Sequence, residues 1–470
     1  MQSPYWFSGH IRTVHFVGIG GIGMSGLAEI LINLKFRVQG SDLRESSAVT
    51  HLRALGATVY IGHDEKNIDG ADVVVHTSAV KSDNPEIRAA WKQRMPVIRR
   101  AELLAELMRL QSGIAVAGTH GKTTTTSLVA LLLNHSGLEP TVVIGGNANN
   151  IGANARVGDG YHLVAEADES DASFLYLTPD IAVVTNIEEE HLDHYRDLGQ
   201  IMTTFREFLE RVPFFGAAVV CGDDANIRSI IRTYRRRLIR YGMESHNDLV
   251  ARMLPPDNGN QCFEVFYNQA SIGTFALPVP GRHMILNALA AIGVGLILDI
   301  PASTMAEGLR LYRGVRRRMD VKGVVDDIMV VDDYAHHPTE IKATLETIRH
   351  WQPRPLTVVF QPHRYSRTKF FMDDFVTVLH LADTVIILPV YAASEDEFEG
   401  MPSDMLIEKC RDAYGDRILD ARDLEHAVNI LCDCVEPGGV ILTLGAGSVS
   451  SIGDMYLEKK TATGNRNTRQ

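Results

Sequence analysis

Short apolar runs alternate with longer stretches of helical spacing along nearly the whole chain. Between Arg12 and Arg109 the runs TVHFVG, ATVYIG, ADVVVHTS and MPVI are separated by helical segments. This alternation is typical of a parallel sheet covered by helices. It predicts a first α/β domain over residues 1–108.

Two further series of the same kind follow. The second has strand-like runs GIAVAG, YHLVAEAD, DIAVVTN and GAAVVCG, a helix in GKTTTTSLVALLLNHSG, and an apolar helix from about residue 283 to 298. The third begins near Val315 and contains VKGVVDD, DIMVVDDYAHH, PLTVVF, DTVIILP and GGVILTLGAG. We therefore predict a βα pattern throughout, with domain boundaries near residues 108 and 313. The tail KKTATGNRNTRQ lacks apolar periodicity and is expected to be disordered.

Length and composition fit this organisation. A chain of 470 residues exceeds one core, and roughly 100 to 200 residues per domain suggests three. The longest apolar run falls short of the roughly 18 to 20 residues that span a bilayer, and the first residues lack a signal sequence. We expect a cytoplasmic protein without membrane contact, either a monomer or a homodimer.

Charge and cysteine content exclude other classes of protein. A net charge of -12 argues against broad capture of nucleic acid, so we expect no nucleic-acid partner. The five cysteines are scattered and form no CxxC, which argues against a disulfide framework or a zinc site.

The first glycine-rich loop follows the first predicted strand. In VHFVGIGGIGMSG, Gly18, Gly20, Gly21 and Gly23 stand where backbone amides of a helix start can approach phosphates, and Asp42 ends the next strand. Three interpretations remain open from these residues alone: a nicotinamide dinucleotide site, another diphosphate site such as the UDP of an activated sugar, or glycines that only allow close packing.

The second loop, AGTHGKTTTTSL, is a short phosphate-binding loop. Lys122 is placed to reach the β- and γ-phosphates and Thr123 a metal ion, with Gly118, Gly121 and Thr124 around them. Val116 stands where the longer Walker A motif has glycine. We interpret the region as the P-loop of an ATPase domain.

Acidic and imidazole groups follow two later strands of the same predicted sheet. Glu166, Asp168, Glu169 and Asp171 come after one strand, and Asn186, His191 and Asp193 after another. Mg²⁺ prefers oxygen ligands and neutralises charge on a transferring phosphoryl group. A magnesium site is therefore expected here, although a solvated acidic turn and a structural histidine are the alternatives.

Nine ordered segments resemble the Mur ligase family. They are GIGGIGMSG, HTSAV, GTHGKTTTT, EADESDASF, TNIEEEHLDHY, PGRHMILNALAA, GVRRRMD, DDYAHHPTEI and FQPHRYSRT. The resemblance implies a Rossmann-like domain (1–108) that binds the UDP of a sugar substrate, a central ATP-binding Mur ligase domain (109–312) and a Rossmann-like domain (313–470) that binds the amino acid.

The same resemblance implies roles for individual residues. Substrate contacts would be Gly20, Gly21, Asp42, His76 and Ser78, while Arg99 and Arg100 either add charge near the phosphates or are ordinary surface residues. ATP would be held by Gly118, Thr119, His120, Gly121, Lys122, Thr123, Thr124, His283, Asn287 and Arg317. Met284 departs from the His-Asn pair usual in the adenine segment. Magnesium ligands would be Thr123, Glu169 and His191. Tyr334, His336, Arg364 and Arg367 would surround the amino acid and the acyl phosphate, and Lys122, Glu169, His191, Arg364 and Arg367 would be catalytic.

The implied reaction is ATP-dependent and uses Mg²⁺. The carboxylate of UDP-N-acetylmuramate would be phosphorylated by ATP and then joined to L-alanine, with release of ADP and phosphate, in peptidoglycan precursor synthesis. Three alternatives remain: a sister ligase that joins a preformed peptide to the same sugar nucleotide, an NAD(P)-linked oxidoreductase, and a nucleotide-binding regulator without turnover.

Overall fold

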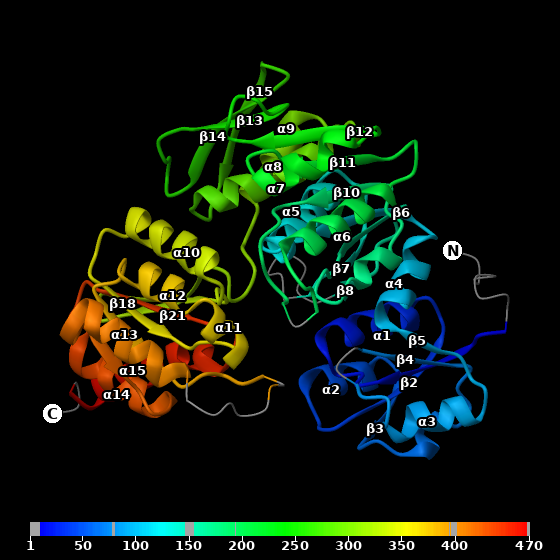
Figure 1. Ribbon diagram of the computed structural model, residues 1–470, viewed down its shortest axis with the longest axis horizontal. Helices are drawn as coiled ribbons and strands as arrows, with labels where there is room; N and C mark the ends of the chain where they lie inside the picture. Colours follow the sequence, from blue (N-terminus) through cyan, green and yellow to red (C-terminus); the bar gives the residue numbers. More distant parts are fainter. Residues whose placement is uncertain are drawn as a thin grey trace. The chain divides into compact units, whose positions relative to one another are not determined.

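The computed structural model describes residues 10–77, 80–145, 155–192, 194–393, 395 and 402–467, which form three sheets with flanking helices (Figure 1). The chain divides into two compact units. The first comprises the chain up to Pro278 together with Met284–Arg313, and the second comprises Val279–His283 and Gly314–Gln470. Each unit is described by itself below.

The first sheet is entirely parallel, as predicted. Its five strands have the order β3-β2-β1-β4-β5 and span β1 (Thr13–Val17), β2 (Arg37–Asp42), β3 (Thr58–Ile61), β4 (Val73–His76) and β5 (Val97–Arg99). The helices are α1 (Ile22–Asn33), α2 (Ser47–Ala54), η2 (Glu65–Ile68), α3 (Pro85–Lys92) and α4 (Arg100–Met108). Since β1 pairs with β2 on one side and β4 on the other, its carboxyl end is the switch point where such sheets bind ligands.

The second sheet has ten strands in the order β15-β14-β13-β12-β11-β10-β6-β9-β7-β8. They span β6 (Ser112–Ala117), β7 (Thr141–Val143), β8 (Ala155–Arg156), β9 (His162–Glu166), β10 (Ile181–Val184), β11 (Ala217–Cys221), β12 (Arg237–Gly242), β13 (Leu249–Met253), β14 (Gln261–Tyr267) and β15 (Ala270–Leu277). The expectation of βα units throughout is wrong for the antiparallel pairs β13–β14 and β14–β15 at one end of the sheet and β7–β8 at the other, and for the pair β16 (Asp320–Val325) and β17 (Ile328–Asp333) of the third sheet. Antiparallel neighbours need no helical crossover between them.

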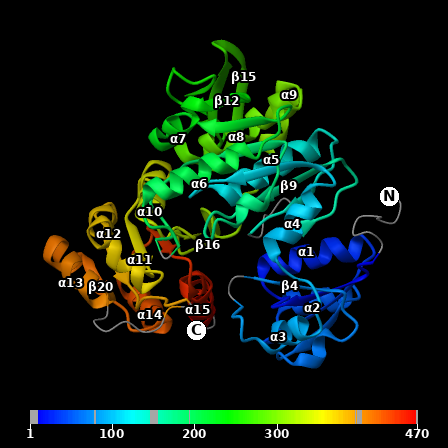
Figure 2. The same cartoon turned by 45° about the vertical axis from the view of Figure 1, so that its right-hand side comes forward.

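The helices that accompany the second sheet are α5 (Lys122–His135), η3 (Ser173–Tyr176), α6 (Leu198–Glu210), α7 (Ala225–Ile230), η4 (Ile231–Thr233), α8 (Arg282–Ile297) and α9 (Ala302–Arg310). They belong to the first unit, except for the first two residues of α8, and α5 directly follows the lysine loop (Figure 2). Eleven residues of α8 are buried, from Met284 to Gly295, which agrees with the predicted apolar helix. A helix buried on most sides belongs to a protein interior.

The third sheet lies in the second unit and has the order β16-β17-β21-β18-β19-β20. Its strands are β16 (Asp320–Val325), β17 (Ile328–Asp333), β18 (Leu356–Phe360), β19 (Thr384–Ile387), β20 (Ile418–Asp420) and β21 (Val440–Leu444). All pairs are parallel except the β16–β17 hairpin. The helices are α10 (Pro338–Trp351), α11 (Tyr365–Phe370), α12 (Met372–Leu379), α13 (Pro402–Tyr414), η5 (Gly415–Arg417), α14 (Leu424–Cys434), η6 (Ser448–Ser450) and α15 (Ser451–Asn467).

The last helix corrects a prediction. Residues 459–467 belong to α15, so the expected disorder is wrong for that part of the tail. The buried side chains of Ile452 and Tyr456 anchor the helix on the core beside β21. Lys459, Lys460 and Ala462, which favour helix, then allow it to continue without apolar spacing of its own.

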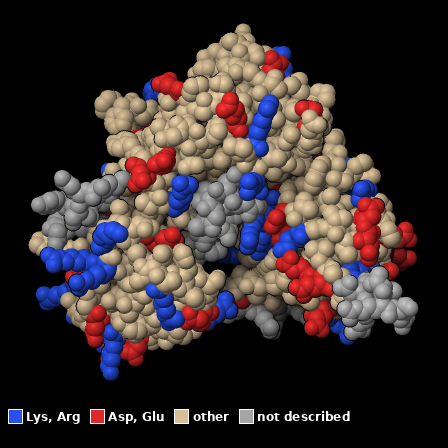
Figure 3. All heavy atoms as spheres, turned by 180° about the vertical axis from the view of Figure 1, so that it is seen from behind, with Lys and Arg blue, Asp and Glu red and all other residues tan. Residues whose placement is uncertain are grey.

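No helix in the described segments is both long and apolar enough to cross a bilayer. Figure 3 shows both basic and acidic side chains on the face that it draws.

Candidate active site

The first glycine loop is fixed by the strand beside it. The amides of Gly18 and Ile19 donate to the Ser41 carbonyl at 2.8 and 2.9 Å, and the Gly20 amide donates to Oδ2 of Asp42 at 2.8 Å. A β-carbon at Gly20 would lie 2.9 Å from that oxygen, so a larger residue would displace the Asp42 carboxylate. Asp42 therefore holds the loop that precedes α1, whose free amides favour an anion.

His76 ends β4 at the same edge of the sheet. The strand register pairs it with Val17, directly before the glycine loop, and its Nδ1 lies 3.0 Å from the Thr77 carbonyl oxygen. Ser78 lies outside the described residues.

The lysine loop connects β6 to α5 as predicted. Gly121 precedes the helix with a left-handed φ of 82°, which glycine adopts without strain. Nζ of Lys122 donates to the carbonyls of Gly118 and Thr119 at 2.6 and 3.1 Å and to Oε1 of Glu169 at 2.7 Å. Thr123 is the second residue of α5, within the same first turn.

Glu169 is the most deeply buried carboxylate of the acidic segment. It is 2% exposed, and its Oε1 also lies 3.5 Å from Nε2 of His191. Oε2 is buried and has no hydrogen-bond partner among the described residues. A buried carboxylate oxygen without a donor is costly unless a cation completes it. Glu169, His191 and the hydroxyl of Thr123 therefore offer donors that fit a divalent metal ion.

The charges around Lys122 keep it protonated. Burial acts to lower the pKa of Lys122, but the carboxylates of Glu169, Asp168 and Glu166 outweigh burial and raise that pKa above its usual value. The pKa of Asp168 is lowered, against the effect of burial, by the Ser170 side chain and amide and by the charges of Lys122 and Arg100. The site therefore combines a fixed ammonium with ionised carboxylates.

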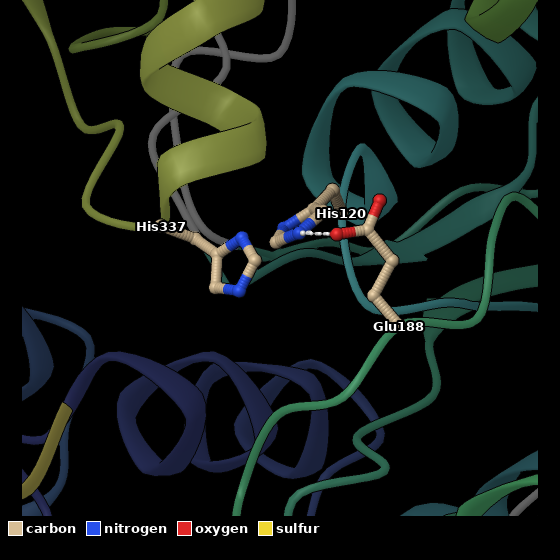
Figure 4. A group of neighbouring side chains, drawn as sticks. All are labelled: His120, Glu188 and His337. Carbon is tan, nitrogen blue, oxygen red and sulfur yellow. Dashed lines mark ion pairs between the residues drawn. The ribbon is translucent and has the colours of Figure 1, made fainter. Parts of the chain in front are cut away.

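The loop after β10 is tied to the lysine loop. Asn186 accepts the His120 amide at 2.8 Å and donates to the His120 carbonyl at 3.0 Å. The Thr119 hydroxyl accepts the Glu188 amide at 2.9 Å, and Nε2 of His120 lies 3.5 Å from the Glu188 carboxylate (Figure 4). The loop that carries His191 is thus held in register with the loop that carries Lys122.

Helix α7 holds the other side of the same loop. Oδ2 of Asp224 accepts the Ile187 amide at 3.2 Å, while Asn226 donates to the Ile187 carbonyl at 2.8 Å. His191 has a φ of 56°, in the left-handed region that side chains other than glycine adopt at a cost. Such a conformation persists only where its surroundings impose it.

A cavity of about 350 Å³ joins the two glycine loops within the first unit. Its lining includes Gly21 and Gly23 from one loop, Lys122 from the other, Glu166 and Asp168 from the acidic segment, and Arg100. Arg99, in contrast, is exposed. Arg100 therefore fits the interpretation as a site residue, and Arg99 fits the interpretation as an ordinary surface residue.

Two residues of the predicted adenine segment differ in their surroundings. Asn287 is 7% exposed, and its Oδ1 accepts from the Thr125 hydroxyl at 3.2 Å beside Gly121. His283 belongs to the second unit, where burial, with a smaller effect of the charge of Arg318, lowers its pKa to about 4. His283 is therefore neutral at physiological pH.

The second unit groups the other predicted residues at the carboxyl ends of β17 and β18. The Tyr334 ring lies 4.8 Å from the Arg317 guanidinium carbon and makes an edge contact with His336 at 5.4 Å. Nη1 of Arg367 lies 3.0 Å from Nδ1 of His363. Arg364 directly precedes α11 with φ of 66°, and its amide donates to the Tyr391 carbonyl at 2.8 Å.

Three residues of these sites escaped the sequence interpretation. His363 lies between His336 and Tyr391, with ring centroids 5.7 and 5.6 Å away. The signal for His363 was present, because it adjoins Arg364 in FQPHRYSRT. Glu188 and Tyr391 carried no comparable signal.

Comparisons with known proteins agree with this geometry. The family models described as "Mur ligase family, catalytic domain", "Mur ligase middle domain" and "Mur ligase, glutamate ligase domain" match residues 13–112, 116–295 and 317–447. A UDP-N-acetylmuramate–L-alanine ligase of Desulfosudis oleivorans is 50% identical over 448 residues, covering 94% of this chain and 97% of its own. One of Trichlorobacter lovleyi is 49% identical over 457 residues, covering 96% and 99%.

A solved structure extends the likeness to three dimensions. The crystal structure of the UDP-N-acetylmuramate–alanine ligase of Thermotoga maritima superposes with a TM-score of 0.82 at 29% identity, covering 96% of this chain and 99% of that one. With three matching domain models and relatives of this identity over nearly their full length, the chain belongs to the Mur ligase family.

Proposed function

We propose that the chain ligates L-alanine to the carboxylate of UDP-N-acetylmuramate through an acyl phosphate, releasing ADP and phosphate, as a step of peptidoglycan precursor synthesis in the cytoplasm. Members of the Mur ligase family are ATP-dependent. Relatives that cover nearly the whole chain bear the name of this activity. The observation that carries the proposal is the contact between the lysine loop and a buried carboxylate, Lys122 Nζ to Glu169 Oε1 at 2.7 Å.

Phosphorylation solves a chemical problem of the substrate. A carboxylate is a poor electrophile, because its negative charge repels an attacking amine and because an oxide ion is a poor leaving group from the acyl carbon. The carboxylate oxygen attacks the γ-phosphorus of ATP, the bond from that phosphorus to the oxygen of ADP breaks, and Lys122 stabilises charge on the phosphoryl oxygens. The amine of L-alanine then attacks the acyl carbon, its nitrogen gives up a proton, and the C–O bond to phosphate breaks. The reactive intermediate has to be kept from water.

Mg²⁺ fits the donors around Glu169. We propose Thr123, Glu169 and His191 as the residues that hold it. Oε2 of Glu169, for which the described residues supply no hydrogen-bond partner, would be one of its ligand atoms. When bound, Mg²⁺ supplies positive charge that stabilises the transferring phosphoryl group. Asn186, Asp224 and Asn226 orient the backbone from which His191 projects.

The remaining predicted residues are assigned by unit. In the first unit we propose Gly20, Gly21, Asp42, His76 and Ser78 for the sugar nucleotide, and Gly118 to Thr124 with Asn287 for ATP. In the second unit we propose Arg317 and His283 for ATP, and Tyr334, His336, Arg364 and Arg367 for the amino acid and acyl phosphate. Arginine suits these anions because its planar fork binds two oxygens at once. Domain boundaries near residues 108 and 313 remain part of the proposal.

A mass measurement of the product tests the function. The purified chain is incubated with UDP-N-acetylmuramate, ATP and Mg²⁺, and with either L-alanine or an alanine-initiated tripeptide. We expect one added alanyl residue and one ADP per product. Addition of the tripeptide alone would instead identify the sister ligase. A change in absorbance at 340 nm with NAD(P)H and no ADP would identify an oxidoreductase, and no product with either amine would contradict ligase activity.

A further inference from the structure

Arg100 stands between the two glycine loops of the first unit. It is the first residue of α4, and its side chain is 26% exposed. A β-carbon at Gly23 would lie 3.0 Å from its Nη1, so the guanidinium lies against the backbone of the first helical turn of α1. Its Nη2 lies 3.3 Å from Oδ2 of Asp168, beside Glu169. One cation thus connects the sugar-nucleotide loop with the acidic segment.

The guanidinium of Arg100 has more donors than the described residues engage. A guanidinium has five N–H donors. Within the described segments, Asp168 is the hydrogen-bond acceptor found for Arg100, and the contact is monodentate. The carboxylate of Asp168 is 44% exposed and also accepts the Ser170 amide at 3.1 Å, so Arg100 is not its sole partner. The guanidinium can therefore turn toward an anion in the cavity without leaving Asp168 uncompensated.

One side of the cavity is suited to an anion, and the other side carries the carboxylates of Glu166 and Asp168. Gly21 and Gly23 bring backbone amides without side-chain bulk, and Arg100 and Lys122 bring positive charge. Lys122 is engaged by Glu169 and two carbonyls, whereas Arg100 has its single ion pair. An anionic group that enters beside Gly23 meets Arg100 first.

We propose that Arg100 binds an anionic group of the sugar nucleotide and so positions the substrate between the glycine loop and the lysine loop. The assignment rests on the proposed function, which supplies this substrate. Two groups of the substrate have the required chemistry, its diphosphate and its lactyl carboxylate. Arg100 binds either one through the fork of its guanidinium.

Binding of two matched nucleotides separates these groups. UDP-N-acetylmuramate and UDP-N-acetylglucosamine share the diphosphate, and only the first carries the lactyl carboxylate. Affinities are measured by calorimetry, without ATP, for the wild-type chain and Arg100→Gln. Hydrogen bonds to charged groups contribute about 1.5 to 3 kcal/mol, so we expect Arg100→Gln to weaken binding about 10- to 100-fold. Weakening of both ligands assigns the diphosphate, and weakening of UDP-N-acetylmuramate alone assigns the carboxylate.

Two further variants serve as controls. Arg99→Gln removes the same charge from the exposed neighbouring position and should leave both affinities within about twofold. Asp168→Asn removes the ion pair but keeps the guanidinium, so binding should be unchanged or tighter. Thermal melting checks that each variant is folded. A folded Arg100→Gln chain that binds both nucleotides as the wild type does would overturn the proposal, as would equal losses in Arg100→Gln and Asp168→Asn.

The outcome is distinguishable from a failure of the proposed function. If the wild-type chain itself bound neither nucleotide, the function and its substrate would be wrong. If the wild-type chain bound UDP-N-acetylmuramate and formed the alanyl product, while Arg100→Gln did both equally well, only the role of Arg100 would be wrong.

Discussion

Nζ of Lys122 lies 2.7 Å from Oε1 of Glu169, although the two residues are separated by 47 positions in the chain. The carboxylate side chain is 3% exposed, so loss of either partner would leave a buried group without its ion pair. This pair joins the residue proposed to hold phosphate with the residue proposed to hold magnesium.

Replacement of Lys122 should abolish ligation. Lys122→Met removes the ammonium that stabilises the phosphoryl oxygens, and we expect ADP release to fall by roughly 10²- to 10³-fold or more. Lys92→Met, on the exposed side of α3, removes the same charge and should retain activity. The measurement is ADP release with all three substrates. Normal ADP release by a folded Lys122→Met chain would show that the phosphate loop has been misassigned.

Replacement of Glu169 should change the requirement for metal. Glu169→Gln keeps the shape of the side chain but removes the charge, so we expect half-maximal activity to need about 10- to 100-fold more Mg²⁺, the range for loss of a group that supports a metal site. A chelator should abolish turnover in the wild type. Asp171→Asn is the matched acidic control, because the Asp171 carboxylate accepts the Ser173 amide. An identical Mg²⁺ titration for Glu169→Gln and wild type would argue against metal binding here.

Gly121→Ala should disrupt the lysine loop by a defined clash. Gly121 has φ of 82°, and a β-carbon there would lie 2.7 Å from Oδ1 of Asn287. Gly137, just past the other end of α5, has φ of 79° and open space around it. Both alanine variants carry the same backbone strain, on the order of 1 kcal/mol, but only Gly121→Ala meets Asn287.

The two variants are compared by ATP affinity and by the free energy of unfolding. Gly121→Ala should lower the affinity for ATP at least about tenfold. Gly137→Ala should lower only the free energy of unfolding. Gly121→Ala combined with Asn287→Ala should recover part of the lost stability. Equal ATP affinities for the two glycine variants would contradict the close approach of Asn287.

Asp333 should make stability depend on pH in the second unit. It is 4% exposed and accepts the Met319 and Ala335 amides at 2.7 and 2.8 Å. Burial raises its pKa to about 6, despite the opposing charge of Arg318. An unfolded aspartate titrates near about 3.9. Between these values the folded chain binds more protons than the unfolded chain, so stability falls as pH rises from about 4 to 6.

The expected loss is on the order of 3 kcal/mol, and it should be absent in Asp333→Asn. Denaturant unfolding of both chains across pH 4 to 7 measures the difference. The variant starts from lower stability, because its amide nitrogen cannot accept one of the two backbone donors. Parallel pH profiles for the two chains would show that Asp333 is ionised throughout.

Sequence reasoning found the elements whose signals are local. The strands before both glycine loops are apolar on both faces, and the helix starts follow from glycine and lysine spacing, so β1, β6, α1 and α5 were predictable. The antiparallel strands β13 to β15 were not recognised, since β15 is exposed at most of its first five positions and lacks an apolar run.

The sequence predicted which residues belong to the candidate site better than it predicted the contacts between them. Lys122, Glu169 and His191 each follow a strand of one sheet, which brings them to a common edge. The position of Arg100 depends on how α4 packs near the acidic segment. Because its sequence neighbour Arg99 has the same side chain, the sequence alone could not distinguish the two. The contact of Asn287 with Gly121 spans 166 positions, and no local pattern encodes it.

Isotope transfer tests the central claim most directly. UDP-N-acetylmuramate labelled with ¹⁸O in its lactyl carboxylate is incubated with the chain, unlabelled ATP, Mg²⁺ and L-alanine, and the released phosphate is analysed by mass spectrometry. An acyl phosphate leaves one carboxylate oxygen on phosphorus, so we predict one ¹⁸O atom per phosphate released. Phosphate without label, recovered together with the alanyl product, would contradict activation of the carboxylate by phosphorylation.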